Sequence, residues 1–394
     1  MPTVDERLER LFADAAVEPT AEPDVFGAVA RKRHQRHTRR VARNVGALVV
    51  LLVVLGGSLA WLTTDEGTEP AVAPTHRDAR TLDDAWLGAQ QVALTPDLGY
   101  VQGPFLQSGD AIEVATYTRN GTGFKVPSHV VRIDATGRVL DEVELKGEVL
   151  SLAEGEGARW AVTHDGDNVA NRLYRVKRIS ADGTVQSNEF PPGVEPKGSI
   201  AVGGGAAWVP IEGGVLRFDP TTGAYRDRVS LAGWNRIRLV QLGTDVYAYP
   251  MFGTQLARLD ATAPAPSIVD TEVSLVSVAA TRTGLWALTW ANGRGTVAPL
   301  NPISGAFEGD TNGVTLPRRF VGSELQASGA SVWVLGTLTD SQDGVLRLDT
   351  GDRGVVRQSR LVMFRPPNGS AVLGLDGDEV LVAADGELHR VAIR

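Results

Sequence analysis

The residue types that usually carry out chemistry form no recognisable motif in this 394-residue chain. Cysteine is absent, which excludes disulfides, thiolate nucleophiles and cysteine-based zinc sites. His129, His164 and His389 lie in the C-terminal three quarters of the sequence, and no two of them have the spacing of a metal-binding pair. Motifs for a nucleophilic serine, a phosphate-binding loop or a dinucleotide are absent from any suitable context. We therefore predict no catalytic residue, no metal ligand and no cofactor.

Two acidic turns are the remaining candidates for a cation site. They read DGDN at residues 165–168 and DGDE at residues 376–379. Calcium prefers six or more oxygen ligands, and neither turn offers that many by itself. We expect both turns to be solvated.

Tryptophan is the other residue type that suggests a ligand site. Four of the eight tryptophans recur at one strand position of a repeat, which indicates packing; they are Trp160, Trp208, Trp286 and Trp333. Trp234 and Trp290 fall outside that register. These two are our candidate ligand-binding residues, and local packing is the competing interpretation.

The elements that must position these residues repeat along the chain. A short apolar strand recurs with a large residue at one position, and the anchors of successive repeats are Ile112, Trp160, Trp208, Tyr247, Trp286, Trp333 and Leu381. Their spacings are about 39 or 48 residues, a range that is typical of propeller blades. The 44 Gly and 21 Pro also favour short strands joined by tight turns over long helices.

A second apolar strand follows each of the first six anchors and runs into a turn. Polar residues at the start of these turns can accept backbone N–H groups; they are Asp134, Asp219, Asp260, Asn301 and Asp349. Glycines at the end of the turns supply positive φ; they are Gly137, Gly183, Gly223 and Gly305. Each repeat is therefore predicted to be a strand meander with a hairpin.

The seventh repeat stops at Arg394 before a fourth strand can form. A strand at residues 87–94 (LGAQQVAL) lies before the first repeat and can complete it, which would bury an open sheet edge. We therefore predict an all-β domain over residues 86–394, a β-propeller of seven blades, with six or eight blades as alternatives.

The motifs "apolar-Arg-apolar-Asp-x-x-Thr-Gly" and "small-x-Trp-Val" resemble those of propellers of the quinoprotein-like, YVTN-like and virginiamycin B lyase-like type. The resemblance covers about three quarters of the chain and implies the architecture. It does not imply an activity, because the clustered histidines and acids of the lyases and the quinone-docking motif of the dehydrogenases have no match here.

An uncharged apolar stretch precedes the repeats. Residues 45–64 (VGALVVLLVVLGGSLAWLTT) have the length that crosses a bilayer as a helix. A basic run without acids precedes this stretch and predicts a cytoplasmic N-terminus and contact with anionic lipid; it contains Arg31, Lys32, Arg33, Arg36, Arg39, Arg40 and Arg43. We expect a single-pass protein of the cell membrane, with a linker at residues 65–85 and the propeller outside the cytoplasm.

Charge separates the two sides of this stretch. Residues 1–44 hold nine basic and seven acidic residues, so they carry +2, and the remaining 30 basic and 40 acidic residues give −10. An acidic propeller repels phosphates, and we therefore expect no nucleic-acid partner.

Residues 1–44 are predicted to form a cytoplasmic tail of two short helices separated by Pro19 and Pro23. This arrangement resembles the tails of actinobacterial membrane proteins that accompany extracytoplasmic-function sigma factors. The resemblance implies a protein partner for the tail. The zinc-containing subtype is excluded because His34 and His37 have no cysteine beside them.

Three functions remain open from the sequence. The first is a ligand- or protein-binding or sensing module, linked through its tail to sigma-factor signalling. The second is a propeller enzyme of lyase or oxidoreductase type, since Asp and Glu are numerous. The third is a scaffold in an envelope complex. We predict the binding module.

Overall fold

The structure is a computed structural model in which the chain divides into two compact units, Met1–Ala73 and Pro74–Arg394. It describes residues 90–92, 100–108, 111–120, 123–134, 136–165, 173–291, 293–308, 313–318, 320–328, 331–338, 343–350, 356–364, 371–376, 379–384 and 387–392. The predicted tail, membrane span and basic run lie outside these residues. Within the described ranges, no helix has the length and apolar character needed to cross a membrane.

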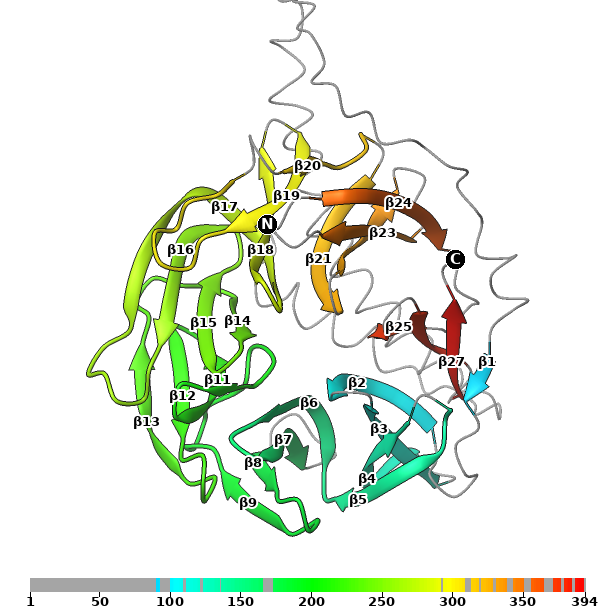
Figure 1. Cartoon of the computed structure of the whole chain (residues 1–394). Helices are drawn as coiled ribbons and strands as arrows, with labels where there is room; N and C mark the ends of the chain where they lie inside the picture. The colour runs from blue at the N-terminus through cyan, green and yellow to red at the C-terminus, as the bar shows by residue number, and fades with distance from the viewer. Residues whose placement is uncertain are drawn as a thin grey trace, which may run out of the picture. The chain divides into compact units, whose positions relative to one another are not determined.

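The described residues form strands β1 to β27, which pair into antiparallel sheets (Figure 1). Blade 1 consists of β2 (Tyr100–Ser108), β3 (Ala111–Asn120), β4 (Gly123–Ile133) and β5 (Val139–Leu145). Blade 2 consists of β6 (Glu148–Gly155), β7 (Ala158–Asp165), β8 (Leu173–Ile179) and β9 (Val185–Glu189). Blade 3 consists of β10 (Ala201–Gly203), β11 (Ala206–Ile211), β12 (Gly214–Phe218) and β13 (Tyr225–Ser230).

Blades 4 and 5 share one long strand, so that their strands form a single seven-stranded sheet. Blade 4 contains β14 (Ile237–Leu242), β15 (Asp245–Pro250), β16 (Gly253–Leu259) and the first part of β17 (Ser267–Thr281). Blade 5 contains the second part of β17 with β18 (Gly284–Ala291), β19 (Arg294–Leu300) and β20 (Val314–Thr315). Blade 6 consists of β21 (Phe320–Ser328), β22 (Ser331–Leu338), β23 (Asp343–Thr350) and β24 (Val356–Phe364).

Blade 7 joins the two ends of the described chain. It contains β25 (Ala371–Asp376), β26 (Glu379–Ala384) and β27 (Glu387–Ala392), and its fourth strand is β1 (Gln90–Val92). Gln91 pairs with His389 in this antiparallel contact. The predicted closing strand is therefore confirmed, and the described sheets make up a seven-bladed propeller.

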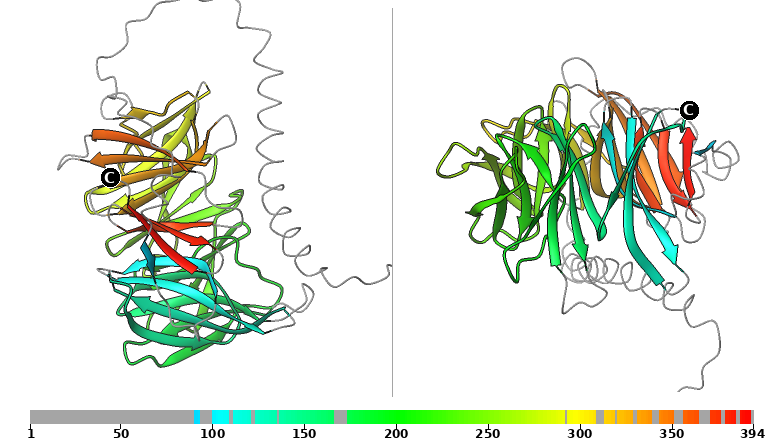
Figure 2. Two further views of the ribbon diagram at one scale, coloured as in Figure 1. Left: turned by 90° about the vertical axis from the view of Figure 1, so that its right-hand side faces the viewer. Right: turned by 90° about the horizontal axis from the view of Figure 1, so that it is seen from below.

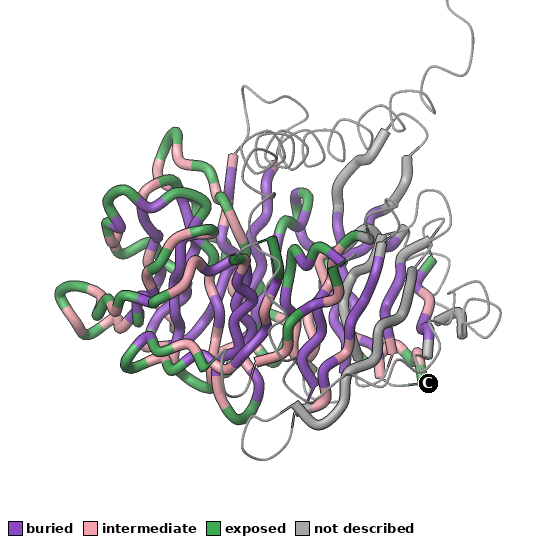
Figure 3. The backbone as a smooth tube through the Cα atoms, turned by 90° about the horizontal axis from the view of Figure 1, so that it is seen from above, coloured by how far each residue is buried: buried purple, intermediate pink, exposed green. Residues whose placement is uncertain are grey.

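The strands of each blade run from one face of the ring to the other (Figure 2), and buried residues concentrate in the middle of the strands (Figure 3). Antiparallel order places the turn after each first strand and the turn after each third strand on the same face. We call this the Asx-turn face, after its turns at residues 134–137, 180–183, 219–223, 260–263 and 301–305.

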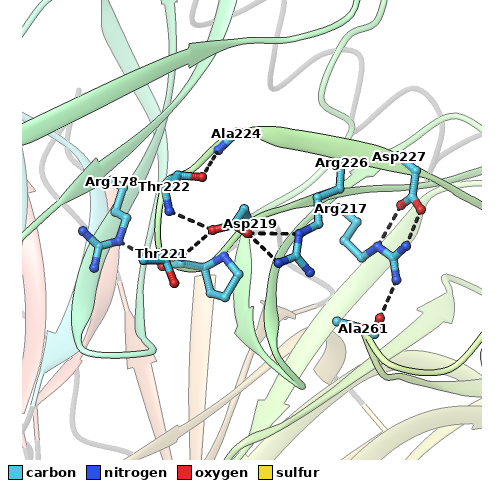
Figure 4. Close-up of polar contacts among 10 residues, drawn as sticks. Arg178, Arg217, Asp219, Thr221, Thr222, Ala224, Arg226, Asp227 and Ala261 are labelled. Atoms are coloured by element: carbon cyan, nitrogen blue, oxygen red, sulfur yellow. Dashed lines mark hydrogen bonds and ion pairs between the residues drawn. The ribbon is translucent and has the colours of Figure 1, made fainter.

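The predicted turn chemistry is present on this face. The carboxylate of Asp219 accepts the N–H groups of Thr221 and Thr222 at 2.8 Å each (Figure 4). Asp134, Asp260 and Asn301 make the equivalent bonds in blades 1, 4 and 5. The predicted positive φ is also present at Gly137, Gly183, Gly223 and Gly305.

The predicted anchors lie on the second strand of each blade and are buried. In five blades the anchor lies directly across the sheet from the arginine of the "apolar-Arg-apolar" motif; the pairs are Trp160–Arg178, Trp208–Arg217, Tyr247–Arg258, Trp333–Arg347 and Leu381–Arg390.

The assignment of Ile112 as the anchor of blade 1 is wrong by one residue. Arg132, which is the motif arginine of blade 1, pairs with Glu113, and Ile112 pairs with Ile133. Glu113 therefore occupies the position that an aromatic or leucine side chain fills in the five blades above. The sequence pattern selects Ile112 because it is the apolar residue next to Glu113.

Side chains and turns also link neighbouring blades by hydrogen bonds. Arg178 of blade 2 donates from Nε to the carbonyl of Pro220 in the turn of blade 3 at 2.9 Å, and Arg217 of blade 3 donates from Nη1 to the carbonyl of Ala261 in blade 4 at 2.8 Å (Figure 4). Arg390 of blade 7 donates to the carbonyl of Asp134 in blade 1 at 3.2 Å. In blades 2, 3 and 7 the motif arginine thus links its blade to the turn of the next one, and the last of these links lies at ring closure.

Candidate functional site

Two cavities lie on the axis of the propeller, near the Asx-turn face. Figure 1 looks along this axis, with first strands such as β2, β6 and β21 closest to the centre. The larger cavity, of about 650 Å³, is lined by Gln241, Leu242, Gly243, Ala280, Thr281, Arg282, Thr283, Gly284 and Ala327. The second, of about 520 Å³, is lined by Leu106, Gln107, Leu152, Ala153, Glu154, Ile200, Ala201, Leu239, Gln241 and Gly243. Gln241 and Gly243 line both, so we treat them as one axial site.

The first strand of each blade is the innermost one, so its inner edge faces the axis and has no further strand to pair with. Side chains from the preceding blade satisfy some of these backbone groups. Ser151 accepts the N–H of Ile200 at 3.3 Å, Ser277 accepts that of Leu325 at 2.9 Å, and the Tyr249 hydroxyl accepts that of Val278 at 3.0 Å. Because these contacts are buried, the inner strands are held in place around the axis.

The lining of the axial site combines apolar surface with neutral hydrogen-bonding groups. The Gln241 amide donates to the carbonyl of Gly243 at 3.2 Å, and the hydroxyls of Thr281 and Thr283 lie 3.0 Å apart. Glu154 is the charged residue of one cavity and Arg282 that of the other, and both are exposed. This mixture is suited to recognition of a ligand that carries both polar and apolar groups.

The described groups with a displaced pKa line neither cavity. Burial between blades 1 and 2 raises the pKa of Glu113 to about 7 and lowers that of Lys177 to about 8. Lys177 donates to the carbonyl of Lys146. In the Asx turns, the hydrogen bond from Thr136 lowers the pKa of Asp134 to about 2, and the N–H of Thr222 holds the pKa of Asp219 well below its usual range.

The two candidate ligand-binding tryptophans lie elsewhere. Trp234 is 6% exposed, packs in the cluster between blades 3 and 4, and donates from Nε1 to the Gln255 side chain at 2.8 Å. Trp290 packs against the cluster between blades 5 and 6 and lies across from Gly295, where an added Cβ would come within 2.9 Å of the indole. Neither residue is part of the axial site, and their ligand role stays a prediction.

Sequence reasoning missed the lining of the axial site. Its residues come from the ends of first strands that are about 40 to 50 residues apart, and no single segment contains a motif. The repeat identified the strands that surround the axis, and this was the signal that could have located the site. Within the ranges described, no group of three or more His, Cys, Asp or Glu side chains is arranged to hold a metal ion.

Comparisons with known proteins find similarity in fold. No protein-family model and no curated protein matches the sequence. Similar solved structures include YCF48 bound to a D1 peptide (13% identity, 83% of this chain and 100% of that chain, TM-score 0.47) and BamB from Moraxella catarrhalis (13%, 78% and 98%, 0.44). Another is a quinoprotein alcohol dehydrogenase-like protein from Bacteroides thetaiotaomicron (11%, 66% and 67%, 0.43). At this level of similarity, the ligands of these proteins are no guide to the ligand of this chain. The assignment of a seven-bladed β-propeller rests on the strand pairing of this chain itself.

Proposed function

We propose that this chain is a single-pass membrane protein whose extracytoplasmic propeller binds a protein or small ligand at the axial site. The observation that carries the binding role is the lining of this site. Amides, hydroxyls and apolar side chains surround it, with Glu154 and Arg282 as its charged groups. Such groups fix the orientation of a ligand by hydrogen bonds and ion pairing.

A binding role is favoured over an enzymatic one by where the displaced titratable groups lie. Catalytic acids and bases usually have displaced pKa values and face a cleft. Here Glu113 and Lys177 lie between blades, and the displaced aspartates stabilise turns. Their positions have a structural explanation.

Site-specific photocrosslinking tests the binding role. Benzoylphenylalanine placed at Gln241, in both cavities, should give a specific adduct in cells, and Arg282→Glu should reduce it. The same probe at Arg294 is the matched control, because Arg294 is an exposed residue of blade 5 on the opposite face. Equal adducts at both positions, or none at Gln241, would contradict the proposal.

The membrane anchor is supported by the sequence of residues 45–64 and the basic run before it. A periplasm-active phosphatase fused after Arg394 should be active, and the same enzyme fused after Asn44 should be inactive. The opposite pattern would reverse the proposed orientation.

The tail is proposed to bind a cytoplasmic protein, and its resemblance suggests a sigma factor. The first test of this part is whether a sigma factor is encoded beside this gene, and the second is a two-hybrid assay between residues 1–44 and that sigma factor. Absence of interaction would remove the signalling role and leave binding at the axial site unaffected.

A further inference from the structure

Five interfaces between neighbouring blades follow one packing rule. The anchor of a blade packs against the residue that precedes the anchor of the next blade, and both are apolar. Five interfaces show such a pair in one buried cluster: Trp160 with Ala207, Trp208 with Val246, Tyr247 with Leu285, Trp286 with Val332 and Leu381 with Ile112.

The interface between blades 1 and 2 breaks this rule at both positions. Its anchor is Glu113, and the residue before Trp160 is Arg159. Nη1 of Arg159 lies 3.7 Å from Oε1 of Glu113, and Nη2 of Arg159 bonds to Asp141 at 2.5 Å. The equivalent apolar pair has thus been replaced by an acid and a base, and we call this interface the charged seam.

The charged seam is costly in its ionised form. Glu113 is fully buried, and neither of its carboxyl oxygens has a hydrogen-bond partner among the described residues. Arg159 and Arg132 favour the ionised carboxyl, whereas Glu154 and Asp141 oppose it, and burial outweighs all four. A buried ion pair without full hydrogen bonding is often less stable than apolar side chains of similar volume.

The charged seam also adjoins the axial site. Glu113 pairs across blade 1 with Leu106, and Arg159 pairs across blade 2 with Glu154. Leu106 and Glu154 both line the smaller cavity. A change in the contact between Glu113 and Arg159 therefore reaches two inner strands at the axis.

We propose that the charged seam is a proton-operated joint, closed when Glu113 is neutral and loosened when Glu113 ionises, while the apolar interfaces stay closed. Protonation removes the unpaired buried charge and lets the two blades pack. Ionisation draws water to the carboxylate and separates β3 from β7. This proposal rests on the packing between blades 1 and 2, and it does not require that the axial site binds a ligand.

Thiol accessibility in the full chain tests the joint, since an introduced cysteine is the sole thiol. Ala161→Cys reports on the charged seam, and Ala248→Cys is a matched control, because each alanine follows the anchor of its blade and is 0% exposed. The reaction rate with 4,4′-dithiodipyridine is measured from pH 5.5 to 8.5 for both. Their ratio removes the effect of pH that the two thiols share. Lys177 lies across the sheet from Ala161 and has a pKa lowered to about 8, so Glu113→Gln is needed to separate the contribution of Glu113 from that of Lys177.

The ratio should rise at least about tenfold across this range, because the ionised fraction of Glu113 rises through neutral pH. Glu113→Gln should flatten the profile. The double change Glu113→Trp with Arg159→Ala, which restores the apolar rule, should flatten it at a low rate. A ratio that does not change with pH, or an unchanged profile in Glu113→Gln, would overturn the proposal.

Discussion

Glu113 shows how a single buried side chain can make the stability of the fold depend on pH. Burial raises its pKa from 4.5 to about 7, so the folded chain binds the proton more tightly than the unfolded chain. The stabilisation from this proton is complete below pH 4.5 and is lost as the pH rises through 7.

Glu113→Gln should therefore change stability in a pH-dependent way. At pH 8.5 the variant should be more stable than the natural chain by up to about 3 kcal/mol, because it carries no buried charge. At pH 4.5 the two should differ little. Urea unfolding of both proteins at the two pH values measures this, and an equal difference at both would contradict the assigned burial of charge.

Asp219 illustrates a local structure that the sequence predicts well. Its carboxylate accepts two backbone N–H groups and also bonds to Arg226 at 2.5 Å. The next residue, Pro220, provides the carbonyl that Arg178 reaches from blade 2. The Asx turn therefore supports both its own hairpin and a link between blades.

Asp219→Ala should destabilise the propeller by about 1–2 kcal/mol, because it leaves backbone donors without a partner. Asp245→Ala is the control, since it leaves the backbone donors of the turns paired and removes an ion pair with Arg258 at 2.8 Å and a side-chain hydrogen bond with Tyr247; a solvent-accessible ion pair contributes less than about 1 kcal/mol. Thermal unfolding should rank the two variants in this order. The reverse order would show that the hydrogen bonds of this turn do not stabilise the fold.

At the scale of elements, local patterns predicted more than long-range ones. The period of the repeat predicted the second strand of every blade, and the missing fourth strand of the seventh repeat predicted β1. The continuous strand β17 was not expected. The spacing of 39 residues from Tyr247 to Trp286 does not explain it, because Trp208 and Tyr247 are equally far apart and their blades share no strand.

The axial site and the charged seam could not be read from the sequence. The site depends on how far the first strands stand from the axis, which no local pattern encodes. The seam depends on register: Ile112 and Glu113 are adjacent, and only the pairing of Glu113 with Arg132 shows which of them faces blade 2.

The closure of the ring by β1 can be tested by deletion of this strand. Deletion of residues 90–92 should leave β27 with an open edge and lower the melting temperature by several degrees, because the ring then lacks its closing contact. Deletion of residues 70–72, in the predicted linker, is the length-matched control and should have little effect. Circular dichroism measures both melting temperatures. Equal values for the two deletions would show that β1 does not close the ring.

At the scale of the whole molecule, the protein has two parts with different proposed roles. Residues 1–64 carry the predicted tail and membrane span, and the described propeller supplies an axial site between inner strands. The acidic character of residues 45–394 suits a domain that does not bind nucleic acid. We propose that this propeller faces the outside of the cell and binds a partner at its axis.

Labelling of single cysteines with a membrane-impermeant maleimide tests this claim most directly. Thr283→Cys lies at the axial site and Arg294→Cys on the opposite face of the same blade, and both positions are exposed. In intact cells Arg294→Cys should react as fast as in the purified chain, and Thr283→Cys should react several-fold more slowly than in the purified chain because a partner covers it. Failure of both to react in intact cells would contradict the orientation, and equal reactivity of Thr283→Cys in cells and in the purified chain would contradict binding at the axis.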